Sequence, residues 1–373
     1  MTKSKKKHVI PQQTYLTDDL IIEEILTRLP IKSILQFKSV SKHWCSTLSS
    51  SHFANAHLIK SGLSRPSAPV DTLFIHYRNK NYLFSYDDDD DHDDDQVLGN
   101  FKDKVVKLDV DFGKKEYLRL TGCCNGLICL TELSNKYFVL WNPATRMLHK
   151  YESYGYLKRF DELKRPIVCS GFGYSSAIDD YKYVRIFKEH LGSVNIVHIF
   201  SLRENKWREI EFGHDPLLLY RHAVPVNEKL YWAANCSKAG DLVVSFDLGN
   251  ERFDIIKINW LETEVLGVMG GHLSKCSYRG DKIMHILQPT SVLKSICLPK
   301  GLRLDSFSQM VGFTKADKIF VTGSSCDDVG SGSRILGLVD TCTKPMKYTA
   351  LLRFDMLLNI ARYFPSLVSP IPM

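Results

Sequence analysis

The stretch Phe138-Val139-Leu140-Trp141-Asn142-Pro143-Ala144-Thr145-Arg146-Met147-Leu148 places an apolar run, a polar turn and a second run within eleven residues. Asparagine followed by proline is typical of a turn, so the stretch predicts a β-hairpin. The same order recurs along the chain, each time with a polar residue that ends an apolar run and a large apolar residue six positions later. The four pairs are Asn142 with Leu148, Ser201 with Trp207, Asp247 with Phe253, and Asp340 with Met346. The chain therefore contains an internal strand-turn-strand repeat.

The spacing of these hairpins predicts a β-propeller. Ser201 and Asp247 lie 46 residues apart, and Asp247 and Asp340 lie 93 apart, which leaves room for one degenerate copy near Ser291 to Cys297. Propeller blades are about 40 to 50 residues long. Other short apolar runs complete an all-β pattern: Phe138 to Trp141, Ile196 to Phe200, Leu230 to Trp232, Leu242 to Phe246, Ile319 to Val321 and Ile335 to Val339. A pair of β-sandwiches would give similar hairpins and is the alternative fold.

Side-chain patterns add detail to this β region. Ser245 and Asp247 alternate with apolar neighbours, which predicts a strand with one buried face. The pair Asn125-Gly126 is typical of a tight turn, so these residues are interpreted as backbone devices and not as ligands. Trp141, Trp207 and Trp232 are expected to fill the space between sheets.

A helical periodicity precedes the β pattern, from Leu16 to about Lys60. The first predicted helix follows a cap at Thr17-Asp18-Asp19 and ends at Pro30, while Ser33 and Ser41 are suitable caps for a second and a third helix. The apolar residues are Ile22, Ile25, Leu26 and Leu29 in the first helix, Ile34, Leu35 and Phe37 in the second, and Trp44 and Leu48 in the third. About forty residues rarely bury enough apolar surface to fold alone. We therefore expect the segment to pack on the remaining chain or on another protein.

Three stretches of the helical segment carry a family resemblance. They are Leu16-Thr17-Asp18-Asp19-Leu20, Glu24-Ile25-Leu26-Thr27-Arg28-Leu29-Pro30-Ile31-Lys32-Ser33 and Phe37-Lys38-Ser39-Val40-Ser41-Lys42-His43-Trp44. Together they resemble an F-box, especially of the plant type. Two features differ from the family pattern: Thr17 stands where a proline usually follows the first leucine, and the stretch from Leu16 to Pro30 is one residue longer than the common spacing.

Motifs of the β region extend the resemblance over nearly the whole chain. They are Gly122-Cys123-Cys124-Asn125-Gly126-Leu127-Ile128-Cys129, Leu140-Trp141-Asn142-Pro143-Ala144-Thr145-Arg146, Gly171-Phe172-Gly173-Tyr174, Asp179-Asp180-Tyr181-Lys182-Tyr183-Val184, Phe246-Asp247-Leu248 and Ser366-Leu367-Val368. These motifs are similar to those of the plant F-box-associated interaction domain, in the F-box/kelch-repeat-like group that includes S-locus F-box-type proteins. The expected fold is α+β and multidomain: a disordered basic tail over residues 1–14, a small three-helix F-box over 15–60, and an all-β, kelch-like propeller domain over 61–373.

Charge is segregated along the chain. The formal net charge is +7, although eight aspartates fall between Asp87 and Asp95. Because like charges repel, this run is expected to form an acidic disordered loop, and the cluster Lys3 to Lys7 a solvated tail. The other positive charges are scattered singly, so nucleic-acid binding is not expected.

No membrane or secretory segment is predicted. No stretch approaches the roughly 18 apolar residues that a membrane span needs, and the first residues lack the apolar core of a signal peptide. The ten cysteines belong to a chain much longer than a small disulfide scaffold. Reduced thiols and a cytoplasmic or nuclear location are therefore expected.

No motif indicates catalysis or metal binding. The chain lacks a Gly-x-Ser-x-Gly elbow, a phosphate-binding Gly-Lys-Ser/Thr loop and a His-Glu-x-x-His zinc helix. Cys123, Cys124 and Cys129 form no Cys-x-x-Cys pair. Asp179-Asp180 is interpreted as a turn or solvated surface, because neighbours on a strand point to opposite faces. We expect no enzymatic activity, no cofactor and no metal.

The resemblance implies the substrate-recognition subunit of an SCF-type (cullin-RING) ubiquitin ligase. A Skp-family adaptor would bind the F-box and link it to the cullin, while the β domain would bind a target protein for ubiquitination and degradation. The matching F-box positions imply adaptor contacts at Leu16, Leu20, Ile25, Leu29, Pro30, Val40 and Trp44. Some of these residues must instead form the core of the small domain.

Two other functions stay open from the sequence. A non-ligase interaction scaffold is suggested by Thr17 and the longer spacing, and a propeller can also be a carbohydrate-binding or enzymatic domain. The target is not identified by any motif. The S-locus resemblance suggests a basic target such as a secreted-type ribonuclease, which would suit the acidic run.

Overall fold

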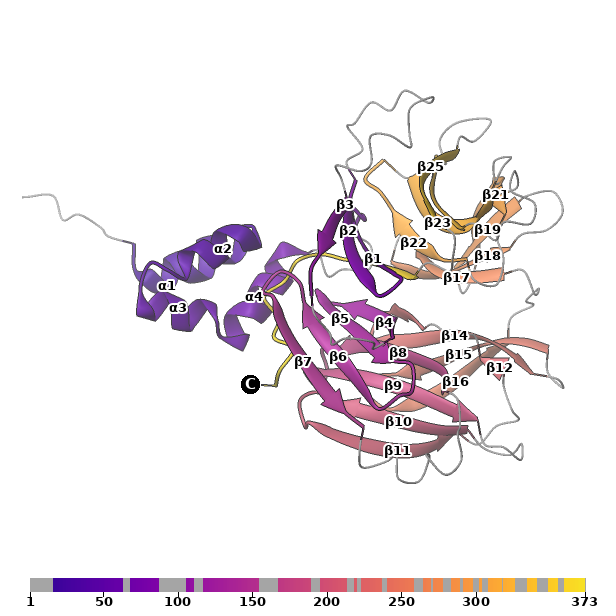
Figure 1. The fold of residues 1–373 in the computed structure, drawn as a ribbon, viewed down its shortest axis with the longest axis horizontal. Helices are drawn as coiled ribbons and strands as arrows, with labels where there is room; N and C mark the ends of the chain where they lie inside the picture. Colours follow the sequence, from indigo (N-terminus) through magenta and orange to yellow (C-terminus); the bar gives the residue numbers. More distant parts are fainter. Residues whose placement is uncertain are drawn as a thin grey trace, which may run out of the picture.

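Mostly antiparallel strands form the β domain in the computed structural model of this chain, and a group of short helices precedes them (Figure 1). The structure describes residues 16–62, 68–86, 105–110, 117–153, 167–188, 195–212, 218–219, 223–236, 240–257, 264–269, 271–277, 283–288, 291–297, 302–303, 308–316, 318–325, 334–340, 348–354 and 359–372. The basic tail and the acidic run predicted from the sequence, and also Met346, lie outside these residues.

The helical segment contains four α-helices where the sequence predicted three. They are α1 (Asp18–Leu20), α2 (Ile31–Phe37), α3 (Lys42–Leu48) and α4 (Ser51–Ser61). Helix α4 was not predicted because its buried residues do not share one partner. Phe53 packs with the other helices, whereas Leu58 packs with residues of the β domain.

Two of the three predicted helix caps are confirmed. The Thr17 hydroxyl accepts a hydrogen bond from the Leu20 backbone N–H at 3.5 Å, and the Ser41 hydroxyl accepts one from the Trp44 N–H at 3.1 Å. The prediction for Ser33 is wrong. Helix α2 begins earlier, directly after Pro30, whose ring fixes φ near the value a helix start requires.

A wide helical turn explains the unusual length of the first F-box stretch. Residues Ile21–Ile25 form a π-helical turn, in which the Leu26 N–H donates to the Ile21 carbonyl five residues earlier, and a 3-10 turn over Leu26–Arg28 follows. A π turn holds one residue more than an α turn. The additional residue between Leu16 and Pro30 is therefore absorbed within this turn.

The β domain consists of sheets arranged as a propeller, and their described strand pairs are antiparallel except for one parallel pair, at Gly267 and Met310. Five sheets have four or more described strands and a sixth has two. Three of them have four strands each: β26 (Asn359–Arg362), β1 (Thr72–Tyr77), β2 (Lys80–Ser85) and β3 (Val105–Leu108); β4 (Leu118–Cys124), β5 (Leu127–Glu132), β6 (Tyr137–Asn142) and β7 (Met147–Glu152); and β8 (Ile167–Ser175), β9 (Asp180–Lys188), β10 (Asn195–Ser201) and β11 (Lys206–Phe212).

The remaining strands complete the ring of sheets. The fourth sheet contains β12 (Leu218–Leu219), β13 (Val224–Val226), β14 (Lys229–Cys236), β15 (Gly240–Asp247) and β16 (Arg252–Lys257). The largest contains β17 (Glu264–Met269), β18 (His272–Ser277), β21 (Leu302–Arg303), β22 (Met310–Phe313), β23 (Lys318–Ser325), β24 (Arg334–Asp340) and β25 (Tyr348–Phe354). The two-stranded sheet pairs β19 (Ile283–Gln288) with β20 (Ser291–Cys297).

The repeat seen in the sequence corresponds to a fixed place in these sheets. Strands β6, β10, β15 and β24 end at the four predicted anchors, and the next strand in the chain pairs with each of them. All six predicted apolar runs lie in strands, and β20 occupies the position expected for the degenerate copy. The propeller prediction is thus confirmed over the β-sandwich alternative.

One burial prediction is wrong. Ser245 of β15 is as inaccessible as its apolar neighbours Val244 and Phe246, so this strand is buried on both faces and not on one. Each sheet of a propeller packs between two neighbouring sheets, and the side chains on both faces of an inner strand are therefore covered. The three tryptophans do fill the space between sheets: Trp141 and Trp232 are buried, and Trp207 packs half-buried beside Phe138.

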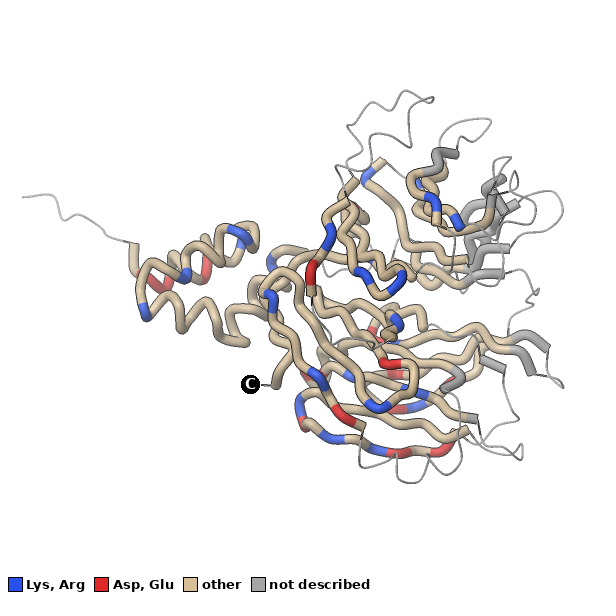
Figure 2. Tube along the Cα trace, viewed as in Figure 1, with Lys and Arg blue, Asp and Glu red and all other residues tan. Residues whose placement is uncertain are grey.

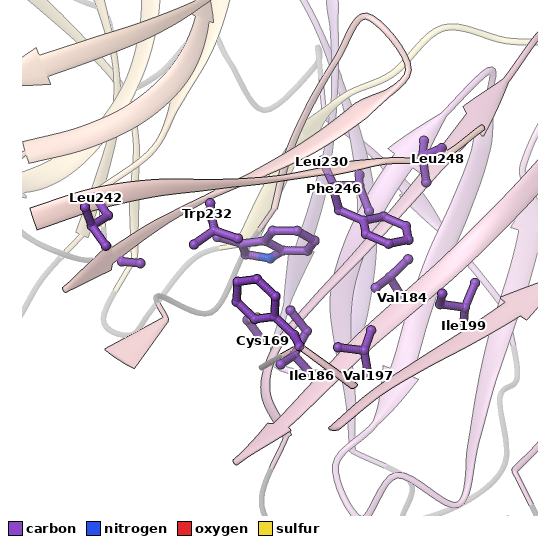
Figure 3. Packing of buried hydrophobic residues seen from close by; sticks show 13 residues of the cluster. Cys169, Val184, Ile186, Val197, Ile199, Leu230, Trp232, Leu242, Phe246 and Leu248 are labelled. Carbon is purple, nitrogen blue, oxygen red and sulfur yellow. The ribbon is translucent and has the colours of Figure 1, made fainter. Parts of the chain in front are cut away.

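The cluster between the third and fourth sheets shows how closely the stacked sheets approach (Figure 3). Trp232 lies across it, and its indole N–H donates to the Ser170 carbonyl of β8 at 3.3 Å. Gly171, in the predicted Gly171-Phe172-Gly173-Tyr174 motif, faces the same cluster. A Cβ on Gly171 would lie 2.6 Å from the Ala223 Cβ and 2.9 Å from a Leu230 methyl.

Gly171→Ala should therefore destabilise the β domain. Overpacking of a filled core costs about 1–3 kcal/mol, and urea unfolding followed by fluorescence would measure the loss. The matched control is Gly122→Ala, whose Cβ would meet Phe172 at an ordinary 3.5 Å. Equal effects of the two substitutions would contradict the role of close sheet packing at Gly171.

A row of polar side chains crosses the third sheet. The Arg185 guanidinium donates to Nδ1 of His198 at 3.2 Å, and Nε2 of His198 lies 3.1 Å from a Glu209 carboxylate oxygen. Because arginine can only donate, Nδ1 is the acceptor and the His198 proton resides on Nε2. Burial, aided by the positive charge of Arg185, lowers the pKa of His198 to about 3.

This pKa shift predicts acid sensitivity. Below pH 6.5 the unfolded chain binds a proton at His198 that the native protein does not bind, so the free energy of unfolding falls as the pH drops from about 6.5 towards 3. The loss approaches about 1.4 kcal/mol per pH unit, or about 2 kcal/mol at pH 5 relative to neutral pH. Urea unfolding of the wild type and His198→Gln at pH 7 and pH 5 tests this, since the variant should lose that part of the pH dependence. Parallel profiles would show that His198 titrates normally.

Candidate functional site

The candidate site is the outer surface of the helical segment, where the seven expected adaptor contacts separate into two groups. Leu16, Leu20, Ile25, Pro30 and Val40 are exposed, and Leu29 and Trp44 are half-buried. The exposed fractions are 63% for Leu16, 52% for Leu20, 45% for Ile25 and 60% for Val40. We refer to these four apolar residues as the apolar helical surface.

Local structure explains why these side chains face outward. Thr17 caps the start of α1, and the following turns direct Ile22 and Leu26 into the helical core. Leu20 and Ile25 remain exposed. Exposed leucine, isoleucine and valine gathered in one short segment are typical of a protein-binding surface. The arrangement can bind an apolar partner surface, and it holds no reacting group.

Trp44 and Leu29 pack on the helical core. The Trp44 ring meets the Phe37 ring edge-on, with 5.9 Å between centroids. Leu29 packs on the same cluster, and its carbonyl lies 2.9 Å from Nε2 of the buried His57 in α4. These contacts support the helices that carry the exposed residues.

An ion pair connects the π turn to the last helix of the segment. Glu24 lies 3.3 Å from the Lys60 ammonium in α4 and 3.6 Å from the Arg28 guanidinium. Lys60 also donates to the Glu23 carbonyl at 2.5 Å. In Figure 2, acidic and basic positions are interspersed over both the helical segment and the β domain.

The cysteines grouped in the sequence occupy neighbouring strands β4 and β5. Burial raises the pKa of Cys124 to about 12, and it also raises the pKa values of Cys123 and Cys129 well above the ordinary thiol value. The thiols are thus protonated at neutral pH and poor nucleophiles. Within the described ranges, no three His, Cys, Asp or Glu residues are placed to hold a metal ion.

The adjacent aspartates have separate structural tasks. Asp179 lies in the turn between β8 and β9 and accepts a hydrogen bond from the Tyr174 hydroxyl at 2.6 Å. Asp180 is buried and accepts hydrogen bonds from the Ser201 hydroxyl at 2.6 Å and the Arg203 backbone N–H at 2.9 Å.

Among the helices that the structure describes, none is long and apolar enough to cross a membrane.

Sequence reasoning missed a long-range role of Asn142. The prediction of a turn is confirmed, because its carbonyl oxygen Oδ1 accepts from the Ala144 and Thr145 backbone N–H groups. Its amide nitrogen also donates hydrogen bonds to the backbone carbonyls of Ser366 and Val368. The only signal in the sequence was that both stretches belong to recognised motifs.

Trp44→Ala should lower the stability of the helical segment. Removing a large aromatic side chain from a small core costs about 3–5 kcal/mol when it is fully buried, and a half-buried tryptophan should cost less, about 2 kcal/mol. Thermal unfolding followed by far-ultraviolet circular dichroism would measure it. A variant with unchanged stability would instead assign Trp44 to the binding surface alone.

Comparisons with known proteins agree with this geometry. A family model described as F-box domain matches residues 18–55, and a model described as F-box associated beta propeller domain matches residues 71–283. The F-box/kelch-repeat protein At3g23880 of Arabidopsis thaliana is 26% identical over 288 residues, which cover 76% of this chain and 73% of that protein. The F-box protein CPR1 of the same plant is 27% identical over 259 residues, covering 64% of this chain and 59% of CPR1.

Solved structures are similar to this chain only at a lower level. TolB from Acinetobacter baumannii has a TM-score of 0.47 at 7% sequence identity, with 84% of this chain and 72% of that chain covered. A chain of the nidogen/laminin complex has a TM-score of 0.46 at 11% identity, with 79% of this chain and 98% of that chain covered.

Proposed function

We propose a function from one premise: the chain belongs to the family of F-box proteins that carry an F-box associated beta propeller domain. In this proposal it is the substrate-recognition subunit of an SCF-type ubiquitin ligase. The helical segment binds a Skp-family adaptor that connects to a cullin, and the β domain binds the target protein. The role requires a compartment shared with the adaptor and cullin, which we propose to be the cytoplasm or the nucleus.

The observation that carries the proposal is the apolar helical surface. Leu20, Ile25 and Val40 lie within the residues matched by the F-box model, and each is exposed to solvent in the isolated chain. Burying apolar area contributes about 25 cal/mol per Å², so a partner that covers these side chains gains substantial free energy. An adaptor surface with apolar pockets suits them.

The proposed mechanism is non-enzymatic. By holding a target at a fixed distance from a ubiquitin-conjugating enzyme, the chain raises the effective concentration of target lysines around the thioester. No side chain of this protein takes part in the bond that forms. The target itself stays open, and a basic protein is one candidate because of the acidic run.

The altered first turn bears on the alternative of a non-ligase scaffold. Thr17 replaces the usual proline, yet its hydroxyl caps α1. The additional residue lies in the π turn, with Leu20 before it and Leu26 after it. Both departures leave Leu16 and Leu20 on the outside of the segment, and this supports docking over a scaffold that has lost it.

Leu20→Glu and Val40→Glu should each weaken adaptor binding strongly while the fold stays intact. An exposed position tolerates a carboxylate in the free protein, but burying that charge at an interface costs at least about 2 kcal/mol, or about 30-fold in affinity. Co-purification of the full chain with a plant Skp-family adaptor and cullin, followed by titration calorimetry, measures the change.

The matched control is Leu133→Glu, an equally exposed leucine of the β domain at 58%. It should bind the adaptor as the wild type does. Equal binding by all three variants would reject the apolar helical surface as the docking site, and absence of binding by the wild type would favour the scaffold.

A further inference from the structure

The C-terminal strap, residues 364–370, runs between the helical segment and the propeller. It follows β26, which pairs with β1, and the Tyr363 N–H donates to the Thr72 carbonyl at 3.0 Å. Ser366, Leu367, Val368 and Pro370 are buried in this segment although it belongs to no strand or helix. Figure 1 shows the C-terminus beside α4 and β7. Burial of an irregular segment requires specific partners for its polar backbone.

The propeller supplies those partners through two side chains. The Asn142 amide nitrogen donates to the Ser366 carbonyl at 3.0 Å and to the Val368 carbonyl at 2.8 Å. Further along the strap, the Tyr151 hydroxyl donates to the Pro370 carbonyl at 2.6 Å. Three strap carbonyls are thereby fixed to the second sheet.

A glycine allows the strap to lie against the propeller. Gly126, in the turn between β4 and β5, has a φ of +76°, and a Cβ there would lie 2.8 Å from the Phe364 carbonyl oxygen and would collide with the Ser366 side chain. The Asn125-Gly126 pair predicted as a tight turn thus also clears space for the strap.

Two consecutive strap residues pack into two different cores. Leu367 belongs to the core cluster of the helical segment, which also contains Ile34, Leu48 and Phe53. Val368 lies in the propeller cluster, which also receives Leu58 of α4. Neighbouring side chains of an extended chain point in opposite directions, so the strap joins the two cores directly.

We propose that the strap fixes the orientation of the F-box on the propeller and that Asn142 and Leu367 are its positioning residues. A covalent connection from α4 to β1 alone leaves the two parts free to reorient. The strap adds to this connection and to the packing of Leu58 in the propeller cluster, and it makes the helical segment and propeller one cooperative unit. Its effect on ubiquitin transfer rests on the proposed function, whereas the coupling itself is a property of the free chain.

The first test compares Leu367→Ala with Leu351→Ala in the full chain. Leu351 is also buried but lies in a propeller cluster in which no helical residue is described. By differential scanning calorimetry we expect one transition for the wild type, two for Leu367→Ala, and one transition at lower temperature for Leu351→Ala. Amide hydrogen exchange in α2, α3 and α4 should become about tenfold faster or more in Leu367→Ala. A single transition and unchanged exchange in Leu367→Ala would overturn the proposal.

Asn142→Asp releases the strap from the propeller side. The aspartate keeps an oxygen for the Ala144 and Thr145 N–H groups but loses the two donors to the strap and places a negative charge beside its carbonyls. We expect exchange in residues 364–370 to accelerate at least about tenfold.

Small-angle scattering of the adaptor complex separates positioning from simple destabilisation. Asn142→Asp should keep the wild-type adaptor affinity and increase the radius of gyration of the complex. An unchanged radius with accelerated strap exchange would overturn the positioning role. If the wild type fails to bind the adaptor, the proposed function fails, while calorimetry and exchange of the free chain still decide the coupling.

Discussion

The pairing of β26 with β1 is the constraint on which the architecture depends. It joins Asn359–Arg362 to Leu73–His76 by antiparallel hydrogen bonding, so the last strand of the chain completes the sheet that contains the first. An unpaired β1 would present an open sheet edge, which invites association with other chains. The same pairing brings the final residues to the junction with the helical segment. Closure of the ring of sheets and attachment of the helices therefore both depend on this strand pairing.

Local features of the fold were predictable and long-range ones were not. A hairpin such as Phe138–Leu148 is specified by neighbouring residues, because the turn residues and both apolar runs lie within one stretch. The caps at Thr17 and Ser41 are equally local. Helix α4 escaped prediction since its buried face is divided between two cores, and the full burial of Ser245 follows only from stacked sheets.

The candidate site shows the same division. Resemblance to an F-box identified the exposed Leu20 and Val40, but it could not separate them from Trp44, which packs on Phe37. Whether a residue of a small helical domain faces inward depends on the helix crossing geometry, which one sequence does not specify. The contact between Asn142 and Ser366 joins residues 224 positions apart. Neither residue type indicates such a partner, because asparagine and serine are common turn residues.

The π turn at Ile21–Ile25 has a consequence for how this helical segment can change during evolution. A regular helix that gains a residue rotates every following side chain by about 100°, which would carry Leu26 away from the core. Here the wide turn confines the insertion, and both Ile22 and Leu26 remain buried. An insertion of one residue in this turn can thus be tolerated, because the side chains before and after it keep their inward or outward orientation.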